Sequence, residues 1–210
     1  MPRTYHTNAS SEPEDLPWPE HIPKKADKLI LGTFPTRKKN RAFDFFYPNP
    51  SNRFWEVLSE VAGHKIKHMN DSPDTVEERK RILNKLRLGI TDMGATVLRH
   101  KESSADSALF PVEFTDIFKI LTENPKINTL IVTSSSDGNS VFSWLRAYCA
   151  LNHINIQKPK KEDVLPWSRI IPWDVRPIKI ICVCSPSKRV TRPVQELIEM
   201  YREAIKLNLP

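Results

Sequence analysis

The feature that most constrains the fold is a set of three short apolar runs, at residues 28–31, 129–133 and 178–183. Each run is too short for a helix, and its apolar residues are mostly consecutive rather than alternating with polar ones. That pattern is typical of parallel strands buried on both faces, which need helices to connect and cover them. We therefore predict an α/β fold with three α/β/α layers around a short central parallel sheet.

The segments around these runs carry helix signals. Asn52 and Ser72 are good N-caps, and Gly63 is suited to end the first helix. Apolar spacing predicts helices over residues 53–62, 72–86, 114–121, 140–151 and 192–207. Residues 89–111 are predicted to be less regular, and the proline-broken residues 152–173 to form an extra hairpin or a long loop.

The N-terminal part of the chain differs from the rest. Residues 1–25 are polar and proline-rich, which predicts an extended surface arm, and residues 26–210 are predicted to form a single α/β domain. No apolar run approaches the roughly 20 residues that a membrane helix needs, and residues 1–25 lack the apolar stretch of a secretory signal. We therefore expect a cytoplasmic monomer with no membrane partner.

Cysteine, glycine and histidine patterns argue against several kinds of site. Cys149, Cys182 and Cys184 form no CxxC pair or His/Cys cluster, so we expect no metal. We also expect no cofactor, because GxGxxG and GxxxxGK[ST], the usual phosphate cradles, do not occur. GxSxG is missing as well, and none of the six histidines lies in a predicted strand-end loop, which argues against a histidine-dependent triad.

The net charge of +7 and the isoelectric point of about 9.3 favour a polyanionic partner such as DNA. Each Lys or Arg that contacts a phosphate releases a counterion, which strengthens binding. The same charge would also serve solubility alone. Charge alone therefore does not distinguish DNA binding from solubility, and the loops at the strand ends carry the further evidence.

Three loops follow the predicted strands, at residues 32–52, 134–139 and 184–190. Ligands of parallel sheets bind at the carboxyl ends of the strands, where these loops meet. The first loop is too long for an ordinary connection, and its five aromatic residues argue that it is ordered. We therefore expect the functional site among these loops.

Two of the loops resemble motifs of the uracil-DNA glycosylase superfamily. Residues 29–35 read LILGTFP and residues 46–55 read FYPNPSNRFW, which together give a strand, a Gly-x-x-Pro turn, an aromatic residue and an Asn-x-Phe-Trp helix start. Residues 185–187 (Ser-Pro-Ser) resemble the second motif, the loop that enters DNA, and residues 99–106 resemble a middle segment rich in Arg, Ser and Asp. The resemblance covers most of residues 28–207. It is nearest to the mismatch-specific uracil/thymine and the hypoxanthine-DNA glycosylases.

The resemblance implies DNA repair by base excision, in which a damaged base is flipped from DNA into a pocket. Tyr47 is at the family's base-stacking position. The residues expected to bind the base are Gly32, Thr33, Phe34, Pro35 and Tyr47. The residues expected to bind DNA are Ser185, Pro186, Ser187, Lys188, Arg189, Val190 and Arg192, with Val190 as a wedge.

The first motif departs from many family members at Phe34, where they place the Asn or Asp that orients the attacking water. The hypoxanthine branch also lacks a polar residue there and has a later Asn instead. Asn49 and Asn52 are therefore the catalytic candidates. Alternatively, Asn52 serves only as a helix cap and Asn49 as a turn residue. Ser185 stands where other branches have His or Asn, so no residue is assigned to stabilise the leaving base.

Three functions remain open. The first is a monofunctional DNA glycosylase for uracil or hypoxanthine, without strand cleavage, because no lysine is in a nucleophile position. The second is a catalytically inactive DNA- or nucleobase-binding protein of the same fold, which Phe34 favours. The third is an unrelated α/β hydrolase or nucleotide-binding enzyme that uses Asp92, Asp137 and Ser185, and it predicts a pocket without a basic rim.

Overall fold

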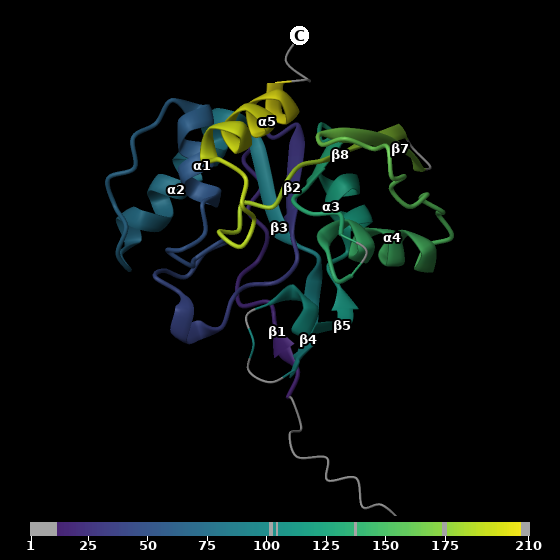
Figure 1. Ribbon diagram of the computed structural model, residues 1–210, viewed down its shortest axis with the longest axis horizontal. Coiled ribbons are helices and arrows are strands. Elements are labelled where there is room, and N and C mark those ends of the chain that lie inside the picture. Colours follow the sequence, from purple (N-terminus) through teal and green to yellow (C-terminus); the bar gives the residue numbers. More distant parts are fainter. Residues whose placement is uncertain (1–11, 101–102, 104, 137, 174–175, 207–210) are drawn as a thin grey trace, which may run out of the picture.

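A five-stranded sheet forms the centre of the computed structural model (Figure 1). The structure describes residues 12–100, 103, 105–136, 138–173 and 176–206. The strands of the sheet are β2 (Lys28–Gly32), β3 (Leu88–Asp92), β6 (Thr129–Val132), β7 (Trp167–Trp173) and β8 (Arg176–Cys182). Their order is β3-β2-β6-β8-β7, and all are parallel except β7, which pairs antiparallel with β8.

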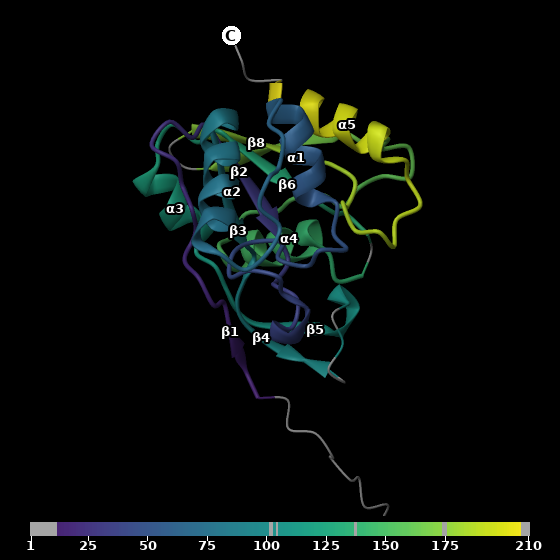
Figure 2. The same cartoon turned by 90° about the vertical axis from the view of Figure 1, so that its left-hand side faces the viewer.

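Helices cover both faces of this sheet. On one face lie α1 (Phe54–Ala62), α2 (Pro73–Leu86) and α5 (Val194–Lys206), and on the other lie α3 (Ile117–Glu123) and α4 (Val141–Leu151). Successive side chains of β2 alternate between the two cores: Leu29 and Leu31 pack with α3 and α4, and Ile30 packs with α1, α2 and α5. Figure 2 views the molecule from the side of α1 and α2, with the sheet behind them. The predicted three-layer α/β/α fold is confirmed.

A second, smaller sheet lies beyond the carboxyl ends of the parallel strands (Figure 1). It consists of β1 (Glu14–Asp15), β4 (Gly94–Arg99) and β5 (Leu109–Phe114), paired antiparallel in the order β1-β4-β5. β1 is an edge strand, so the proline-rich residues around it do not interrupt a ladder. This sheet extends the wall of the molecule beside the strand-end loops.

Two of the predicted segments need correction. The region predicted to be less regular from residue 89 begins with β3, which is buried along its whole length. The strand pairs with β2 on one side, and His21 bridges to Ile90 on the other. These tertiary contacts make the segment a strand, although its Gly- and Thr-containing sequence does not predict one. The helix predicted over residues 114–121 starts only at Ile117, because Phe114 ends β5.

Other local predictions hold. Ser72 caps α2 by accepting a hydrogen bond from the Thr75 amide, and Gly63 ends α1 in the left-handed conformation with φ of 56°. Residues 152–173 include β7, which forms a hairpin with β8. Among the described helices, none is long and apolar enough to cross a membrane.

Candidate active site

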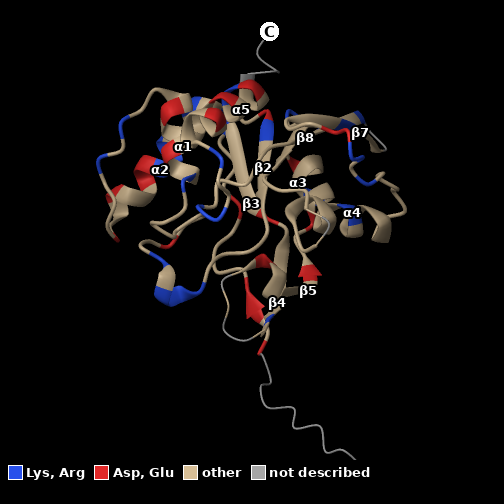
Figure 3. Ribbon diagram, viewed as in Figure 1, with Lys and Arg blue, Asp and Glu red and all other residues tan. Residues whose placement is uncertain are grey.

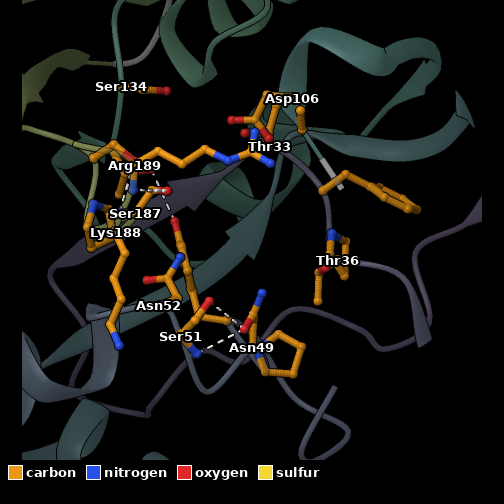
Figure 4. Close-up of a pocket in the computed structure, with 18 of the residues that line it drawn as sticks. Thr33, Thr36, Asn49, Ser51, Asn52, Asp106, Ser134, Ser187, Lys188 and Arg189 are labelled. Carbon is orange, nitrogen blue, oxygen red and sulfur yellow. Dashed lines mark hydrogen bonds between the residues drawn. The ribbon is translucent and has the colours of Figure 1, made fainter. Parts of the chain in front are cut away.

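A cavity of about 290 Å³ opens at the carboxyl ends of the parallel strands (Figure 4). The loops that follow β2, β6 and β8 all contribute to it, and the last residue of β3 adds a fourth wall. Its lining includes Thr33, Phe34, Pro35, Thr36, Tyr47, Asn49, Asn52, Asp92, Asp106, Thr133, Ser185, Pro186, Ser187, Lys188 and Arg189. The three loops singled out from the sequence therefore meet in one place.

All of the predicted site residues line this cavity except Gly32, Val190 and Arg192. Gly32 lies directly behind the wall, against Asp92. Val190 is half-buried and packs against the core beneath α1 and α5. Arg192 forms an ion pair of 3.0 Å with Glu196 at the start of α5.

Gly32 is required by a close approach rather than by its backbone conformation. An ideal β-carbon at this position would lie 2.0 Å from Oδ1 of Asp92 and 3.1 Å from the hydroxyl oxygen of Tyr47. Real β-carbons do not come that near to an oxygen atom. The glycine therefore leaves the space in which the Asp92 carboxyl and the Tyr47 hydroxyl sit side by side against the backbone of β2.

Asp92 is a residue of this cavity that the predicted base-binding and catalytic residues did not include. Its side chain is buried and faces the cavity, and none of the described residues donates a hydrogen bond to its carboxyl group. Burial, followed by the charge of Asp106, raises the pKa of Asp92 to about 7, and the charge of Arg41 opposes this shift. A carboxyl group that keeps its proton near neutral pH can donate a hydrogen bond to a ligand. The only signal in the sequence is its place after Leu88–Thr91, a strand that the pattern does not reveal.

Tyr47 lies between the cavity and the helix that follows the first motif. Its ring stacks on Phe54 with centroids 3.7 Å apart and planes 9° from parallel. Its hydroxyl is 3.1 Å from Oγ1 of Thr133, which itself donates to the carbonyl of Leu31. Since a threonine hydroxyl has a single proton, Tyr47 is the donor to Thr133, and the phenol oxygen keeps only acceptor capacity. Burial, together with Asp92, raises the pKa of Tyr47 well above 10, so the phenol stays neutral.

The two candidate asparagines differ in how their side-chain oxygens are used. Oδ1 of Asn49 accepts two hydrogen bonds, from the backbone N–H and the hydroxyl of Ser51, both at 2.9 Å. Oδ1 of Asn52 accepts one, from the N–H of Phe54 at 2.9 Å. A carbonyl oxygen has two lone pairs, so Asn49 is saturated and Asn52 keeps one acceptor site. The N-cap of α1 is Arg53 and not the predicted Asn52, because the helix starts only at Phe54. The Asn52 side chain still binds the first N–H of the helix and keeps one acceptor site for a ligand or water.

Arg53 joins the first motif to the loop at residues 185–192. Its guanidinium group donates to the carbonyl oxygens of Ser187 at 3.0 Å, Val190 at 2.9 Å and Arg192 at 2.7 Å. It also donates to Pro186 at 3.4 Å, and its backbone N–H donates to the same carbonyl at 3.1 Å. The fork of a guanidinium suits several acceptors at once. The loop is therefore wrapped around Arg53 and presents Lys188 and Arg189 outward.

Arg189 reaches across the mouth of the cavity. Figure 4 shows its side chain extending toward Asp106 and Thr33, while the Lys188 side chain points in another direction. Desolvation raises the pKa of Asp106, and a hydrogen bond from the Thr33 hydroxyl, followed by the charges of Arg189 and Arg99, opposes that shift. One wall of the mouth is thus acidic and the facing loop is basic.

Phe34 occupies the position at which many members of the family that the sequence resembles have a polar residue. It is buried, lines the cavity and lies under the Arg99 guanidinium, whose carbon is 5.8 Å from the ring centroid. Its ring gives the cavity an apolar surface. Of the residues proposed for an unrelated hydrolase, Asp92 and Ser185 line the cavity, and Asp137 lies outside the described residues. Within the described part of the chain, no cluster of His, Cys, Asp and Glu could hold a metal ion.

No known family profile and no curated protein matches the sequence. Among solved structures, the chain is similar to the solution NMR structure of a putative uracil DNA glycosylase from Methanosarcina acetivorans, with a TM-score of 0.55 and 17% sequence identity. The similarity covers 89% of this chain and 96% of that protein. The fold is uracil-DNA glycosylase-like. At this level of identity the likeness is one of fold, and it extends over nearly the whole of both chains.

Proposed function

We propose that this protein is a monofunctional DNA glycosylase that hydrolyses the N-glycosidic bond of a damaged base, uracil or hypoxanthine, flipped from DNA. The observation that carries the proposal is that the Thr33–Pro35 turn and the Lys188–Arg189 pair line the same cavity. A pocket with a basic rim suits a base that arrives attached to phosphates. It is not what the alternative of an unrelated hydrolase predicts.

Within the cavity, the flipped base lies against Tyr47 and Phe34, whose rings provide apolar and stacking surface. Backbone N–H groups of Thr33 and Phe34, within the turn from Gly32 to Pro35, donate hydrogen bonds to a base carbonyl. The protonated carboxyl of Asp92 donates a further hydrogen bond to the base, and it fills the role of leaving-group stabiliser for which the sequence suggested no residue.

Asn52 orients the water that attacks the sugar, using the acceptor site that its hydrogen bond from Phe54 leaves open. The water oxygen bonds to C1′ while the bond between C1′ and the base nitrogen breaks. The electron pair of that bond departs with the base, and the water loses its proton to solvent. Because the site polarises a water and offers no covalent nucleophile to C1′, the expected product is an intact abasic strand.

Base release from duplex oligonucleotides that contain a single uracil or a single deoxyinosine tests this function. We expect release from at least one of them, with an unbroken abasic product until the strand is cleaved by alkali. Asn52→Ala, purified in parallel, excludes a contaminating glycosylase. No release of either base at enzyme in large excess over DNA would overturn the proposal. Tight, salt-sensitive DNA binding without release would instead support the inactive binding protein that Phe34 favours.

A further inference from the structure

A second basic segment borders the pocket, on a part of the first-motif loop that has no role in the proposed reaction. Four of its five residues, 37–41, are cationic, and it begins directly after Thr36, which lines the cavity. We propose that Lys38 and Lys39 form a second phosphate-binding site, which holds the DNA backbone on the side of the flipped base opposite Lys188 and Arg189. The inference rests on the proposed function and names a part of the DNA footprint that the two motifs do not include.

Hydrogen bonds and a cation–π contact fix the backbone of this segment. Lys38–Asn40 form a short 3-10 turn, and the Asn40 N–H donates to the Arg37 carbonyl at 2.8 Å. Arg41 anchors the turn: its Nε donates to the Thr36 carbonyl at 2.8 Å, and its guanidinium carbon lies 5.1 Å from the ring centroid of Trp18. The anchor turns one cation inward and leaves Lys38 and Lys39 exposed.

The charges of the two lysines are not neutralised within the described part of the chain. Elsewhere, two surface lysines on helices have acidic partners, in the Lys80–Glu77 pair at 2.7 Å and the Lys119–Glu123 pair at 4.0 Å. Among the described residues, no acidic side chain forms an ion pair with Lys38 or Lys39. Two neighbouring ammonium groups repel each other, so successive backbone phosphates that bind one lysine each relieve repulsion as well as releasing counterions.

The placement fits a backbone that crosses the pocket mouth. Figure 4 shows Thr36 on one side of the cavity and Lys188 on the other. Figure 3 shows the basic turn at Lys38–Asn40 and the basic loop before α5 on the same face of the molecule, as two separate blue segments. Turning a nucleotide out of a duplex rotates it about its own backbone, so the phosphates on either side of it have to be held. A single basic loop would hold one of them.

The decisive measurement is the salt dependence of duplex binding by Lys38→Ala/Lys39→Ala. Each lost phosphate contact lowers the slope of log K against log salt by about 0.9, so the double variant should lose about 2 units of slope. Its affinity should accordingly fall about tenfold less than that of the wild type between 50 and 200 mM salt. Lys24→Ala/Lys25→Ala is the matched control, because it removes the same charge from exposed residues just before β2, at the opposite end of the strands from the pocket. This control should keep the wild-type slope.

The outcomes separate this inference from the proposed function. If the slope falls for the Lys38/Lys39 variant alone, the second site is supported. If the wild type also binds DNA but releases no base, the second site is still supported while the proposed glycosylase activity is contradicted. Equal slopes for wild type, variant and control would overturn the second site, whether or not the base is released. Failure of the wild type to bind duplex DNA at low salt would overturn it as well. Thermal unfolding of both double variants checks that each is folded, as expected for exposed positions.

Discussion

Asp92 and Gly32 occupy one space: a β-carbon on Gly32 would stand 2.0 Å from Oδ1 of Asp92. The two residues face each other across the parallel pair of β2 and β3, where they are register partners at the last position of each strand. The absence of a side chain on one strand is therefore what admits a carboxyl group from the other into the wall of the pocket.

Gly32→Ala should displace the Asp92 carboxyl and destabilise the fold, because overfilling a packed site costs about 1–3 kcal/mol. We expect the rate of base release to fall at least tenfold. The loss of stability leaves only a small fraction of the variant unfolded, so unfolding does not explain a fall of that size. Gly138→Ala is the matched control, since a β-carbon there meets nothing within 4 Å. Urea unfolding of both variants makes the comparison. Equal stability of the two would contradict the close approach at Gly32.

Asp92 should make the protein less stable as the pH rises. In the folded chain its pKa is about 7, raised by burial from 3.8, so between pH 4 and pH 7 the unfolded chain loses the proton while the folded chain keeps it. The stabilisation is complete below pH 4 and is lost as the pH rises through 7, with a total on the order of 4 kcal/mol at most. Asp92→Asn should remove this fall.

The test is the free energy of unfolding in urea at pH 5 and at pH 8 for wild type and Asp92→Asn. We expect the variant to be more stable than the wild type at pH 8, and the difference to shrink at pH 5. Asp44→Asn, at an exposed carboxylate of the same loop region, should follow the wild type at both pH values. A parallel pH dependence for Asp92→Asn and wild type would show that Asp92 ionises normally.

Asn52 should contribute to base release and Asn49 should not, because only Asn52 has an acceptor site left on its side-chain oxygen. Asn52→Ser keeps a side-chain oxygen that can accept from the N–H of Phe54, so its stability should stay within about 0.5 kcal/mol of the wild type. Its rate of base release should nevertheless fall by about 100-fold or more. For Asn49→Ala we expect less than a tenfold change. The measurement is the single-turnover rate of base release by each variant on the preferred base. A larger loss for Asn49→Ala than for Asn52→Ser would assign the water to Asn49.

Arg53→Met should release the loop at residues 185–192, because three carbonyl oxygens lose their donor and that of Pro186 keeps only the backbone N–H of residue 53. Trypsin should then cleave after Lys188 or Arg189 much faster than in the wild type, and affinity for DNA should fall with it. Arg53→Lys should lie between the two, since an ammonium cannot serve all four acceptors. Arg202→Met, which removes a surface pair with Glu199, should leave both properties unchanged. Mass spectrometry of the fragments identifies the cleavage site.

The local features of this protein were predictable from the sequence. The runs that became β2, β6 and β8 consist mostly of consecutive apolar residues, and Ser72 and Gly63 mark helix ends by chemistry that acts over a few residues. The Gly-x-x-Pro turn and the second-motif loop were placed at strand ends for the same reason. Residues that follow parallel strands meet at one edge of the sheet, so the sequence also predicted that these loops converge in a single cavity.

Other features depend on contacts between distant segments. β3 contains Gly89 and Thr91 and becomes a buried strand only because β2 and His21 pair with its two edges, and that pairing is what brings Asp92 to the pocket. In the sequence, Arg53 looks like an ordinary surface residue. Its role depends on a loop more than 130 positions later, which folds around its guanidinium group.

The sequence by itself thus determined the strands β2, β6 and β8, the helix ends at Ser72 and Gly63 and the candidate loops, because those features follow from local hydrophobicity and backbone chemistry. Only the tertiary structure decided which carboxyl group is buried against Gly32, which asparagine keeps a lone pair, and which cations remain exposed beside the pocket. Each of these depends on burial and on hydrogen-bond partners, which do not exist until the chain has folded.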